Sequence, residues 1–297
     1  MKEIVVIGCY MRNCHNNSFF IYFSILQTEN FSYHICFNIV EIKVGDIDED
    51  KYSRLRLYEW FDLNKVLRAR ILVVGAGALG NEVCKNLVLN GYKNITIVDM
   101  DRVVKSNLNR CIFFNDEDAE RKRYKAEVIA EKLKMFDKKL NINYYTEEIE
   151  KLDIITKHDI VLGCVDNVKA RLHINAHCYH NKIPYIDGAT HGQVGKVQVV
   201  LPPHTSCLEC GMNVTHSKIL QLRFSCTGKD IKFFEPKIAA DVNTTSIIAA
   251  IQVQEALKLT HGMDNYIKNI FYYDGARNFA DVFELPVNPN CPNHEKE

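Results

Sequence analysis

Residues 70–80 read Arg-Ile-Leu-Val-Val-Gly-Ala-Gly-Ala-Leu-Gly, and this stretch decides the fold. The apolar run predicts a buried strand that ends in a glycine turn. A helical pattern from Leu79 to about Asn90 follows, and then a second apolar run, Ile95–Asp99. The order strand, turn, helix, strand is that of a nucleotide-binding unit.

Each glycine of the turn has its own physical role in such a unit. Gly75 allows the tight turn, Gly77 lets the backbone approach a phosphate, and Gly80 lets helix and strand pack closely. Asp99, at the tip of the second strand, can accept hydrogen bonds from ribose hydroxyls. A glycine turn without a ligand is the alternative, but the flanking strand, helix and acid favour nucleotide binding.

A polar stretch, Asp101–Arg110, follows where loops at the carboxyl ends of parallel strands bind ligands. Its Asn and Arg residues suit a triphosphate, because a guanidinium can donate two parallel hydrogen bonds to a phosphate and side-chain amides can hydrogen-bond to the same group. Lys125 lies where the apolar face of a predicted helix, 119–136, begins. It is the charge of that helix that can point back to the phosphates.

The remaining patterns predict alternating helices and strands, and therefore one α/β domain with a mostly parallel sheet flanked by helices. The expected helices are 57–61, 119–136, 169–179 and 241–259. The expected strands are 142–146, 158–165, 183–188, 194–201, 269–274 and 280–285. We assign this domain to residues 47–297.

Asp166 follows a buried strand and lies above the same crevice as the glycine turn. A carboxylate there is suited to hold Mg²⁺ on a triphosphate. The alternative is an N-cap for the next helix, a position that Asp often takes, and the two roles are compatible.

Two cysteine-containing pairs have the same spacing, Cys207 with Cys210 and Cys291 with His294. Three thiolates and one imidazole complete a closed tetrahedral Zn²⁺ site, which would fix the C-terminus and do no chemistry. Free buried cysteines are the alternative.

Cys226 lies outside any apolar run and is the thiol most expected to be exposed, although reactivity also needs a lowered pKa.

Composition excludes several classes of protein. Among 297 residues, Lys plus Arg and Asp plus Glu both number 37 with no basic stripe, which argues against nucleic-acid binding. Eleven cysteines without a signal peptide indicate reduced thiols in the cytoplasm or nucleus. Residues 1–46 are an uninformative extension with one or two edge strands; the apolar run Ser18–Leu26 is too short to span a bilayer.

Together these residues resemble the ThiF/MoeB/HesA-type adenylyltransferases, which share their adenylation domain with ubiquitin-activating enzymes. The resemblance covers residues 51–294. Its carriers are Tyr52-Ser53-Arg54, the turn Gly75–Gly80, Asp99-Met100-Asp101, Ser106–Arg110, Lys125–Val128, Asp166-Asn167, Asp187-Gly188, Cys207–Cys210 and Ser225-Cys226-Thr227.

The resemblance implies activation of the C-terminal carboxylate of a ubiquitin-like or sulfur-carrier protein, usually ending in two glycines, as an acyl-adenylate made from ATP. It also implies the site residues, which are Gly75, Gly77 and Gly80 for the nucleotide, Asp99 for the ribose, Asn107, Arg110 and Lys125 for the phosphates, and Asp166 beside Asn167 for Mg²⁺. It further implies a dimer, homo- or heteromeric, in which Arg54 reaches the neighbouring subunit's site. Cys226 matches the family's Cys-Thr and is a hypothetical nucleophile for thioester formation or sulfur relay.

Three departures from the family pattern matter. The glycine and proline that usually precede the lysine matching Lys125 are absent, and His294 replaces a cysteine. Only about a dozen residues separate Cys226 from Ala239, where ubiquitin-activating enzymes insert a catalytic-cysteine domain, which argues against thioester transfer.

Three rival functions are weaker. Arg110, Lys125 and Asp166 together argue against a non-catalytic partner subunit. The Asn and Arg residues after Asp101 disfavour an NAD-dependent oxidoreductase. Neutral charge disfavours a family member that adenylates a non-protein substrate such as a tRNA base.

Overall fold

The computed structural model describes residues 6–14, 18–25, 50–211 and 239–294 of the chain. They belong to two compact units, Met1–Asp62 and Leu63–Glu297. In the first unit, β1 (Val6–Cys14) pairs antiparallel with β2 (Ser18–Ile25), and the 3₁₀ turn η1 covers Leu55–Leu57. The expected strands are present, but they form a two-stranded sheet of their own rather than an edge of the main sheet.

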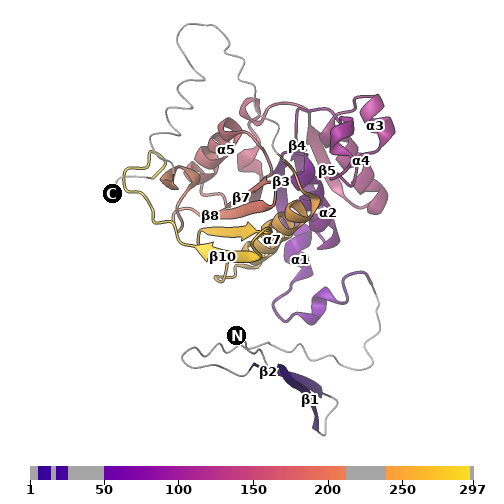
Figure 1. Cartoon of the computed structure of the whole chain (residues 1–297). Helices are drawn as coiled ribbons and strands as arrows, with labels where there is room; N and C mark the ends of the chain where they lie inside the picture. The colour runs from indigo at the N-terminus through magenta and orange to yellow at the C-terminus, as the bar shows by residue number, and fades with distance from the viewer. Residues whose placement is uncertain (1–5, 15–17, 26–49, 212–238, 295–297) are drawn as a thin grey trace. The chain divides into compact units, whose positions relative to one another are not determined.

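The second unit is built on an eight-stranded sheet with the order β10-β9-β8-β7-β6-β3-β4-β5 (Figure 1). Strands β3 to β7 are parallel to one another, and β8, β9 and β10 continue the sheet antiparallel. The strands are β3 (Arg70–Val74), β4 (Asn94–Val98), β5 (Asn141–Tyr145), β6 (Ile160–Gly163), β7 (Tyr185–His191), β8 (Val194–Val200), β9 (Ile270–Asp274) and β10 (Phe279–Phe283).

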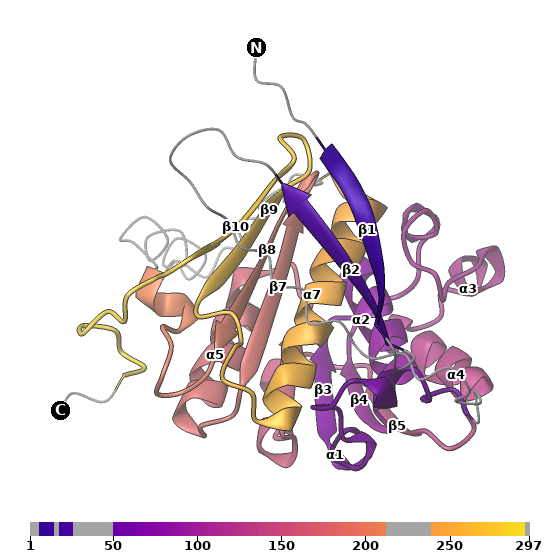
Figure 2. The same cartoon turned by 90° about the horizontal axis from the view of Figure 1, so that it is seen from below.

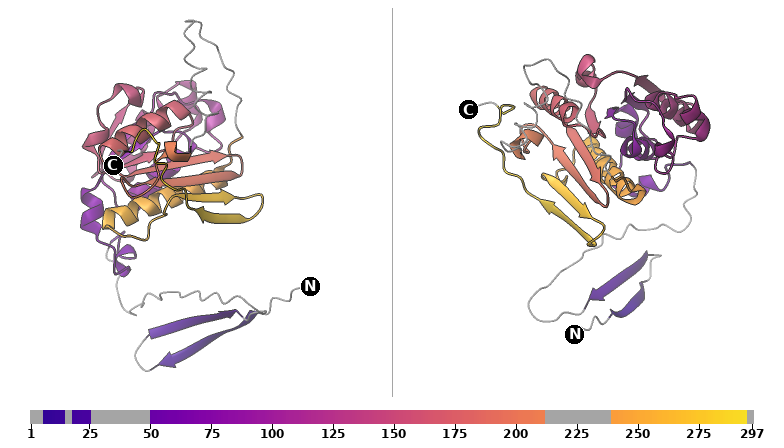
Figure 3. Two further views of the ribbon diagram at one scale, coloured as in Figure 1. Left: turned by 90° about the vertical axis from the view of Figure 1, so that its left-hand side faces the viewer. Right: turned by 45° about the horizontal axis from the view of Figure 1, so that its top comes forward.

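Helices cover both faces of this sheet. On one face α7 packs against α1, α2, β7 and β8, and α4 packs against α2, β4 and β5 (Figure 2). On the other face α5 packs against β6, β7 and three 3₁₀ turns, so that α5 and α7 sandwich the strands (Figure 3). The helices are α1 (Leu63–Arg68), α2 (Ala78–Leu89), α3 (Asp116–Glu120), α4 (Lys125–Phe136), α5 (Val168–His180) and α7 (Val242–His261), and the 3₁₀ turns are η2 (Lys105–Asn107), η3 (Ile149–Lys151), η4 (Ile155–Lys157) and η5 (Leu208–Gly211).

The α/β class predicted from the sequence is therefore confirmed. β3 and β6 are buried on both faces, which explains their continuous apolar sequences. Because β3 lies between β4 and β6, the chain leaves it toward β4 on one side and reaches β6 later on the other. The carboxyl ends of β3 and β6 thus flank the topological switch point, where open α/β sheets bind ligands.

Two predicted helices are wrong in detail. No helix forms at 57–61; Tyr58 and Trp60 stack there instead, and the helix, α1, begins at Leu63. The predicted helix 119–136 is two helices, because an Asn115–Asp118 capping box starts α3 early and Lys122 has φ +49°, which ends it.

The turn between α3 and α4 is held by Arg102. Its guanidinium lies 3.8 Å from the centre of the Tyr124 ring and donates to the Lys122 carbonyl at 2.7 Å. This contact stabilises Lys122 in its left-handed conformation. Lys125 consequently becomes the first residue of α4.

The long C-terminal helix is capped at both ends. The Asp241 carboxylate accepts from the Thr244 backbone N–H at 2.8 Å, and Gly262 ends the helix with φ +71°. Asp241 is thus the N-cap of this helix. No helix within the described residues is long and apolar enough to cross a membrane.

Candidate nucleotide-binding and metal sites

The glycine turn brings the ends of β3 and β6 into direct contact. Gly75 has φ +100°, and a Cβ there would collide with the Cys164 carbonyl that follows β6. A Cβ on Gly80 would collide with the carbonyl of Gly75, so α2 can approach the turn only through a glycine. A Cβ on Gly77, by contrast, would meet nothing within 4 Å. The protein's own packing therefore explains Gly75 and Gly80, whereas the space beside Gly77 is open and could receive a ligand.

The first turn of α2 offers backbone donors beside Gly77. Gly77 is the N-cap of the helix and, being glycine, has no side chain that could make a capping hydrogen bond. The first N–H groups of a helix have no partner within the helix, and with the helix dipole they attract anions. This arrangement fits the phosphate of a nucleotide.

Asp99 ties β4 to the glycine turn. Its two carboxylate oxygens accept from the backbone N–H of Ala76 at 2.6 Å and of Asp101 at 2.7 Å. Each oxygen keeps a further lone pair, which leaves room for a ribose hydroxyl. Burial raises the pKa of Asp99, and the Lys125 ammonium and the two hydrogen bonds offset part of that rise.

Lys125 reaches back from the start of α4 to the same edge of the sheet. Its Nζ lies 2.7 Å from the Asp101 carboxylate, and its backbone N–H donates to the Asp101 carbonyl at 3.0 Å. Burial alone lowers the pKa of Lys125, but the carboxylates of Asp99 and Asp101 outweigh it and leave the pKa raised. Lys125 is therefore a charged amine paired with Asp101 after β4, and its contact with phosphates stays a prediction.

Asn107 and Arg110 lie in the segment that follows. Asn107 is buried, and its side-chain oxygen accepts from the Val104 N–H at 3.1 Å. The Arg110 guanidinium donates to the Ser106 carbonyl at 2.5 Å and to the Asn109 side chain at 2.9 Å. Both side chains hold this segment in shape, and their contacts with phosphates stay predictions.

Asn81 joins this segment to the glycine turn, and sequence reasoning missed it. Its fully buried side chain donates to the carbonyls of Ala76 and Gly77 at 3.1 and 2.9 Å and accepts from the Phe113 N–H at 3.1 Å. The clue in the sequence was an amide directly after the last glycine, on the face of α2 that has to pack inward.

Asp166 and Asn167 follow β6 on the other side of the switch point. Asn167, not Asp166, is the N-cap of α5, and its side chain accepts from the Ala170 N–H at 2.7 Å. The capping alternative for Asp166 is thus wrong, and its exposed carboxylate remains available for a metal ion. The segments that carry Gly75, Asp99 and Asp166 all leave the carboxyl edge of the sheet.

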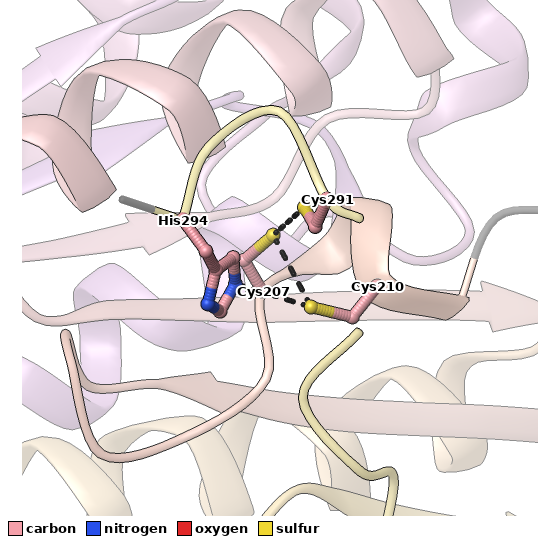
Figure 4. Close-up of side chains that lie close together, drawn as sticks. All are labelled: Cys207, Cys210, Cys291 and His294. Atoms are coloured by element: carbon pink, nitrogen blue, oxygen red, sulfur yellow. Dashed lines mark hydrogen bonds between the residues drawn. The ribbon is translucent and has the colours of Figure 1, made fainter. Parts of the chain in front are cut away.

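The four predicted zinc ligands come together. The ligand atoms of Cys207, Cys210, Cys291 and His294 all lie within 4.8 Å of one another (Figure 4). The Cys207 sulfur lies 3.4 Å from that of Cys291 and 3.8 Å from that of Cys210, and His294 Nε2 lies 3.1 Å from the Cys210 sulfur. Four ligands about 2.0–2.3 Å from a tetrahedral Zn²⁺ are spaced in this way, so the donor set fits zinc.

The surroundings of this cluster also suit a metal. His294 Nδ1 lies 2.9 Å from the Tyr179 hydroxyl, which orients the ring so that Nε2 faces the sulfurs. Burial raises the pKa of Cys210 and raises the pKa of Cys291 to about 12, so a nearby cation is needed for these thiols to ionise. Burial lowers the pKa of His294 and favours the neutral, ligating form.

Two predicted site residues are not among the described residues of the unit Leu63–Glu297. Cys226 lies outside the described residues. Arg54 is exposed at the N-cap of η1, in the unit Met1–Asp62. The roles of both residues therefore stay predictions.

The ThiF family model matches residues 49–293, and the chain belongs to that family. Among curated proteins it is 35% identical over 151 residues to SUMO-activating enzyme subunit 2 of Dictyostelium discoideum, a match covering 50% of this chain and 22% of that protein. It is 37% identical over 157 residues to the NEDD8-activating enzyme E1 catalytic subunit of Arabidopsis thaliana, covering 48% of this chain and 34% of that protein. The chain thus spans well under half the length of these relatives.

Solved structures share the fold. E. coli MccB bound to ATP has a TM-score of 0.67 and 19% identity, with 84% of this chain and 75% of that chain covered. MccB with AMPCPP and MccA has a TM-score of 0.68 and the same identity. The predicted Rossmann-like α/β fold is confirmed by this likeness.

Gly77→Ala provides a test of the nucleotide site. The added Cβ meets nothing in the protein, so we expect the free energy of unfolding to change by less than about 1 kcal/mol. We expect ATP affinity, measured by calorimetry, to fall about tenfold or more, because the methyl occupies the space of a phosphate. Gly75→Ala is the contrast and should destabilise the fold. Unchanged ATP binding by Gly77→Ala would contradict this site.

The metal cluster is tested by metal analysis and unfolding. We expect one Zn²⁺ per chain, lost in Cys291→Ser, with the free energy of unfolding lowered on the order of 3 kcal/mol, as for a ligand at roughly 100 to 1,000 times its dissociation constant. Cys111→Ala, another buried cysteine, should keep its zinc. A wild-type protein that holds no zinc when purified from zinc-replete cells would show that the four residues are merely packed together.

Proposed function

We propose that this protein uses ATP to adenylate the C-terminal carboxylate of a ubiquitin-like or sulfur-carrier protein. One observation carries the proposal: in a ThiF-family chain, the glycine turn, Asp99, Lys125 and Asp166 are all held on segments at one edge of the sheet, around the switch point. The names of the relatives, which are activating enzymes for SUMO and NEDD8, support the same chemistry.

In this proposal each part of the edge has its own task. The turn at Gly77 and the N-terminus of α2 receive phosphate, and Asp99 holds the ribose. Asn107, Arg110 and Lys125 contact the phosphates, and the ion pair with Asp101 supports the placement of Lys125 in this set. Positively charged and amide groups of this kind stabilise the negative charge that develops during phosphoryl chemistry.

Asp166 would hold Mg²⁺, with Asn167 fixing the loop as the cap of α5. Its exposed carboxylate offers the hard oxygen ligand that Mg²⁺ prefers. Bound Mg²⁺ supplies neutralisation of phosphate charge. The rest of the site orients the two reactants.

The reaction is a substitution at the α-phosphorus of ATP. A carboxylate oxygen of the carrier protein forms a bond to this phosphorus, the bond from phosphorus to the β-phosphate oxygen breaks, and pyrophosphate leaves. The carboxylate is already ionised at neutral pH, so no general base is needed. Catalysis then rests on positioning and on charge stabilisation.

A dimer is part of the proposal, with Arg54 of one subunit serving the other subunit's site. An open apolar hollow supports it, lined by Ile112, Phe113, Phe114, Asn115, Lys132, Met135 and Phe136. Ile112 and Phe136 are 61% and 71% exposed, more than large apolar residues usually are on a free surface. A second copy or a related partner subunit would cover them.

The rival functions are less well supported. A non-catalytic partner subunit has no need for the Lys125–Asp101 pair and the open Gly77 position together. An oxidoreductase and a non-protein substrate have no observation of their own in their favour.

ATP–pyrophosphate exchange tests the proposal. We expect exchange only with a carrier protein ending in Gly-Gly, and a loss of about a hundredfold or more in Asp166→Ala, because the metal ion contributes several kcal/mol of charge stabilisation. Lys157→Ala, an exposed lysine at the end of η4, should exchange normally. If ATP binds but no carrier protein supports exchange, the result favours a non-catalytic partner subunit or an enzyme that adenylates a non-protein substrate.

The same assay examines Arg54 in trans. Arg54→Ala should lose exchange on the order of a thousandfold, as for arginine fingers. Mixing it with Asp166→Ala should restore activity, because one site of a mixed dimer keeps both residues. Failure to recover activity after proven subunit exchange would contradict action in trans.

The proposal extends to Cys226 as acceptor of the activated carboxylate or as sulfur relay. Attack of its thiolate on the acyl-adenylate would form a thioester and release AMP. We expect a thiol-sensitive adduct of enzyme and carrier, detected by mass spectrometry, that disappears in Cys226→Ala while pyrophosphate exchange persists. An unchanged set of covalent intermediates in Cys226→Ala would remove this role.

A further inference from the structure

A buried ion pair lies behind the loop that carries Asp166. Arg171 comes from the second turn of α5, and Asp187 lies within β7. The Asp187 side chain is fully buried, and that of Arg171 is 16% exposed. Neither residue was assigned a role from the sequence.

The Arg171 guanidinium joins the end of β6 to the interior of β7. One nitrogen, Nη1, donates to Asp187 Oδ1. The other, Nη2, donates to the carbonyl of Val165, just beyond β6, and to that of Gly188 in β7 at 3.0 Å. The Tyr185 hydroxyl also donates to Asp187 Oδ1, at 2.9 Å, and keeps this carboxylate oriented.

These contacts fix the backbone on one side of Asp166. Val165 directly precedes it and is held by Arg171, while Asn167 directly follows it and is held as the α5 N-cap by the Ala170 N–H. The exposed carboxylate of Asp166 therefore projects from a short span anchored at both ends. Small changes at either anchor will move it.

Stability alone does not account for the pair. The desolvation of two buried charges largely cancels their attraction, so apolar residues of similar volume often stabilise a fold as well or better. Asp187 Oδ2 is also buried without a hydrogen-bond partner among the described residues. What the pair does provide is a planar fork that reaches a carboxylate and two carbonyls at once, which a lysine ammonium does not reproduce.

We propose that Arg171, oriented by Asp187, is a positioning residue that sets the Asp166 carboxylate for Mg²⁺. This inference rests on the proposed role of Asp166. Beyond that role, we infer that the Mg²⁺ affinity depends on the Arg171 guanidinium, which need not contact the metal ion or the nucleotide.

The test measures ATP affinity by calorimetry at a series of free Mg²⁺ concentrations. In Arg171→Lys we expect the Mg²⁺ concentration for half-maximal effect to rise about 10- to 100-fold, the usual consequence of losing a residue that orients a metal ligand. ATP affinity without Mg²⁺ should stay at the wild-type value. Binding of Mn²⁺ with ATP, followed by electron paramagnetic resonance, should weaken by the same factor.

Two control variants separate positioning from general damage. Ile174 lies one turn further along α5, and its side chain is fully buried and apolar. We therefore expect Ile174→Val to lower the unfolding midpoint without changing the Mg²⁺ dependence of ATP binding. Arg70→Lys breaks a similar fork, to Asp159, at the amino edge of the same sheet. If Arg171→Lys fails to fold, Asp187→Asn keeps the guanidinium but loses its counter-charge and should shift the Mg²⁺ dependence in the same direction.

The outcomes are distinct. A shifted Mg²⁺ dependence in Arg171→Lys or Asp187→Asn, absent from both controls, supports the inference. A wild-type Mg²⁺ dependence in the folded variants overturns it while leaving Asp166, tested through Asp166→Ala, in place. If wild-type ATP binding ignores Mg²⁺ altogether, the role of Asp166 is wrong and the inference falls with it.

Discussion

The close approach of Gly75 to the Cys164 carbonyl is the constraint on which the rest of the domain depends. It is possible only without a Cβ, and it brings the ends of β3 and β6 together at the switch point. Every polar segment that we assign to the nucleotide leaves the sheet at this edge. The Ala76–Asp99 hydrogen bond and the Lys125–Asp101 ion pair both lie at this edge.

Much of the fold was predictable because short-range patterns in the sequence determine it. The buried strands β3 and β6, the glycine turn and the capped helix α7 each have a local cause that a sequence displays. The break before α4 was not predictable, since it depends on Arg102 crossing from another loop to support a left-handed Lys122. The helix α1 was misplaced because aromatic residues near Tyr58 imitate an apolar face.

The residues of the candidate site also divide into those that short-range patterns reveal and those that depend on distant segments. Asp99, Lys125 and the four Cys/His residues could be proposed from the sequence by residue type and place, and the structure brings the four Cys/His residues together. Asn81 and Arg171 were missed because their importance lies in backbone carbonyls that come from distant segments. Such partners become visible only once the strands are ordered in space.

The metal cluster has one more consequence, which concerns the unfolded chain rather than the folded one. Cys207 and Cys291 are 84 residues apart, and the chain between them includes α7, β9 and β10. A metal bound to both pairs closes this long loop, and the conformational entropy that a cross-link removes from an unfolded chain grows with loop length. Zinc at this position would therefore restrict the disordered ensemble across the last third of the protein and favour the return of the two C-terminal strands to the edge of the sheet.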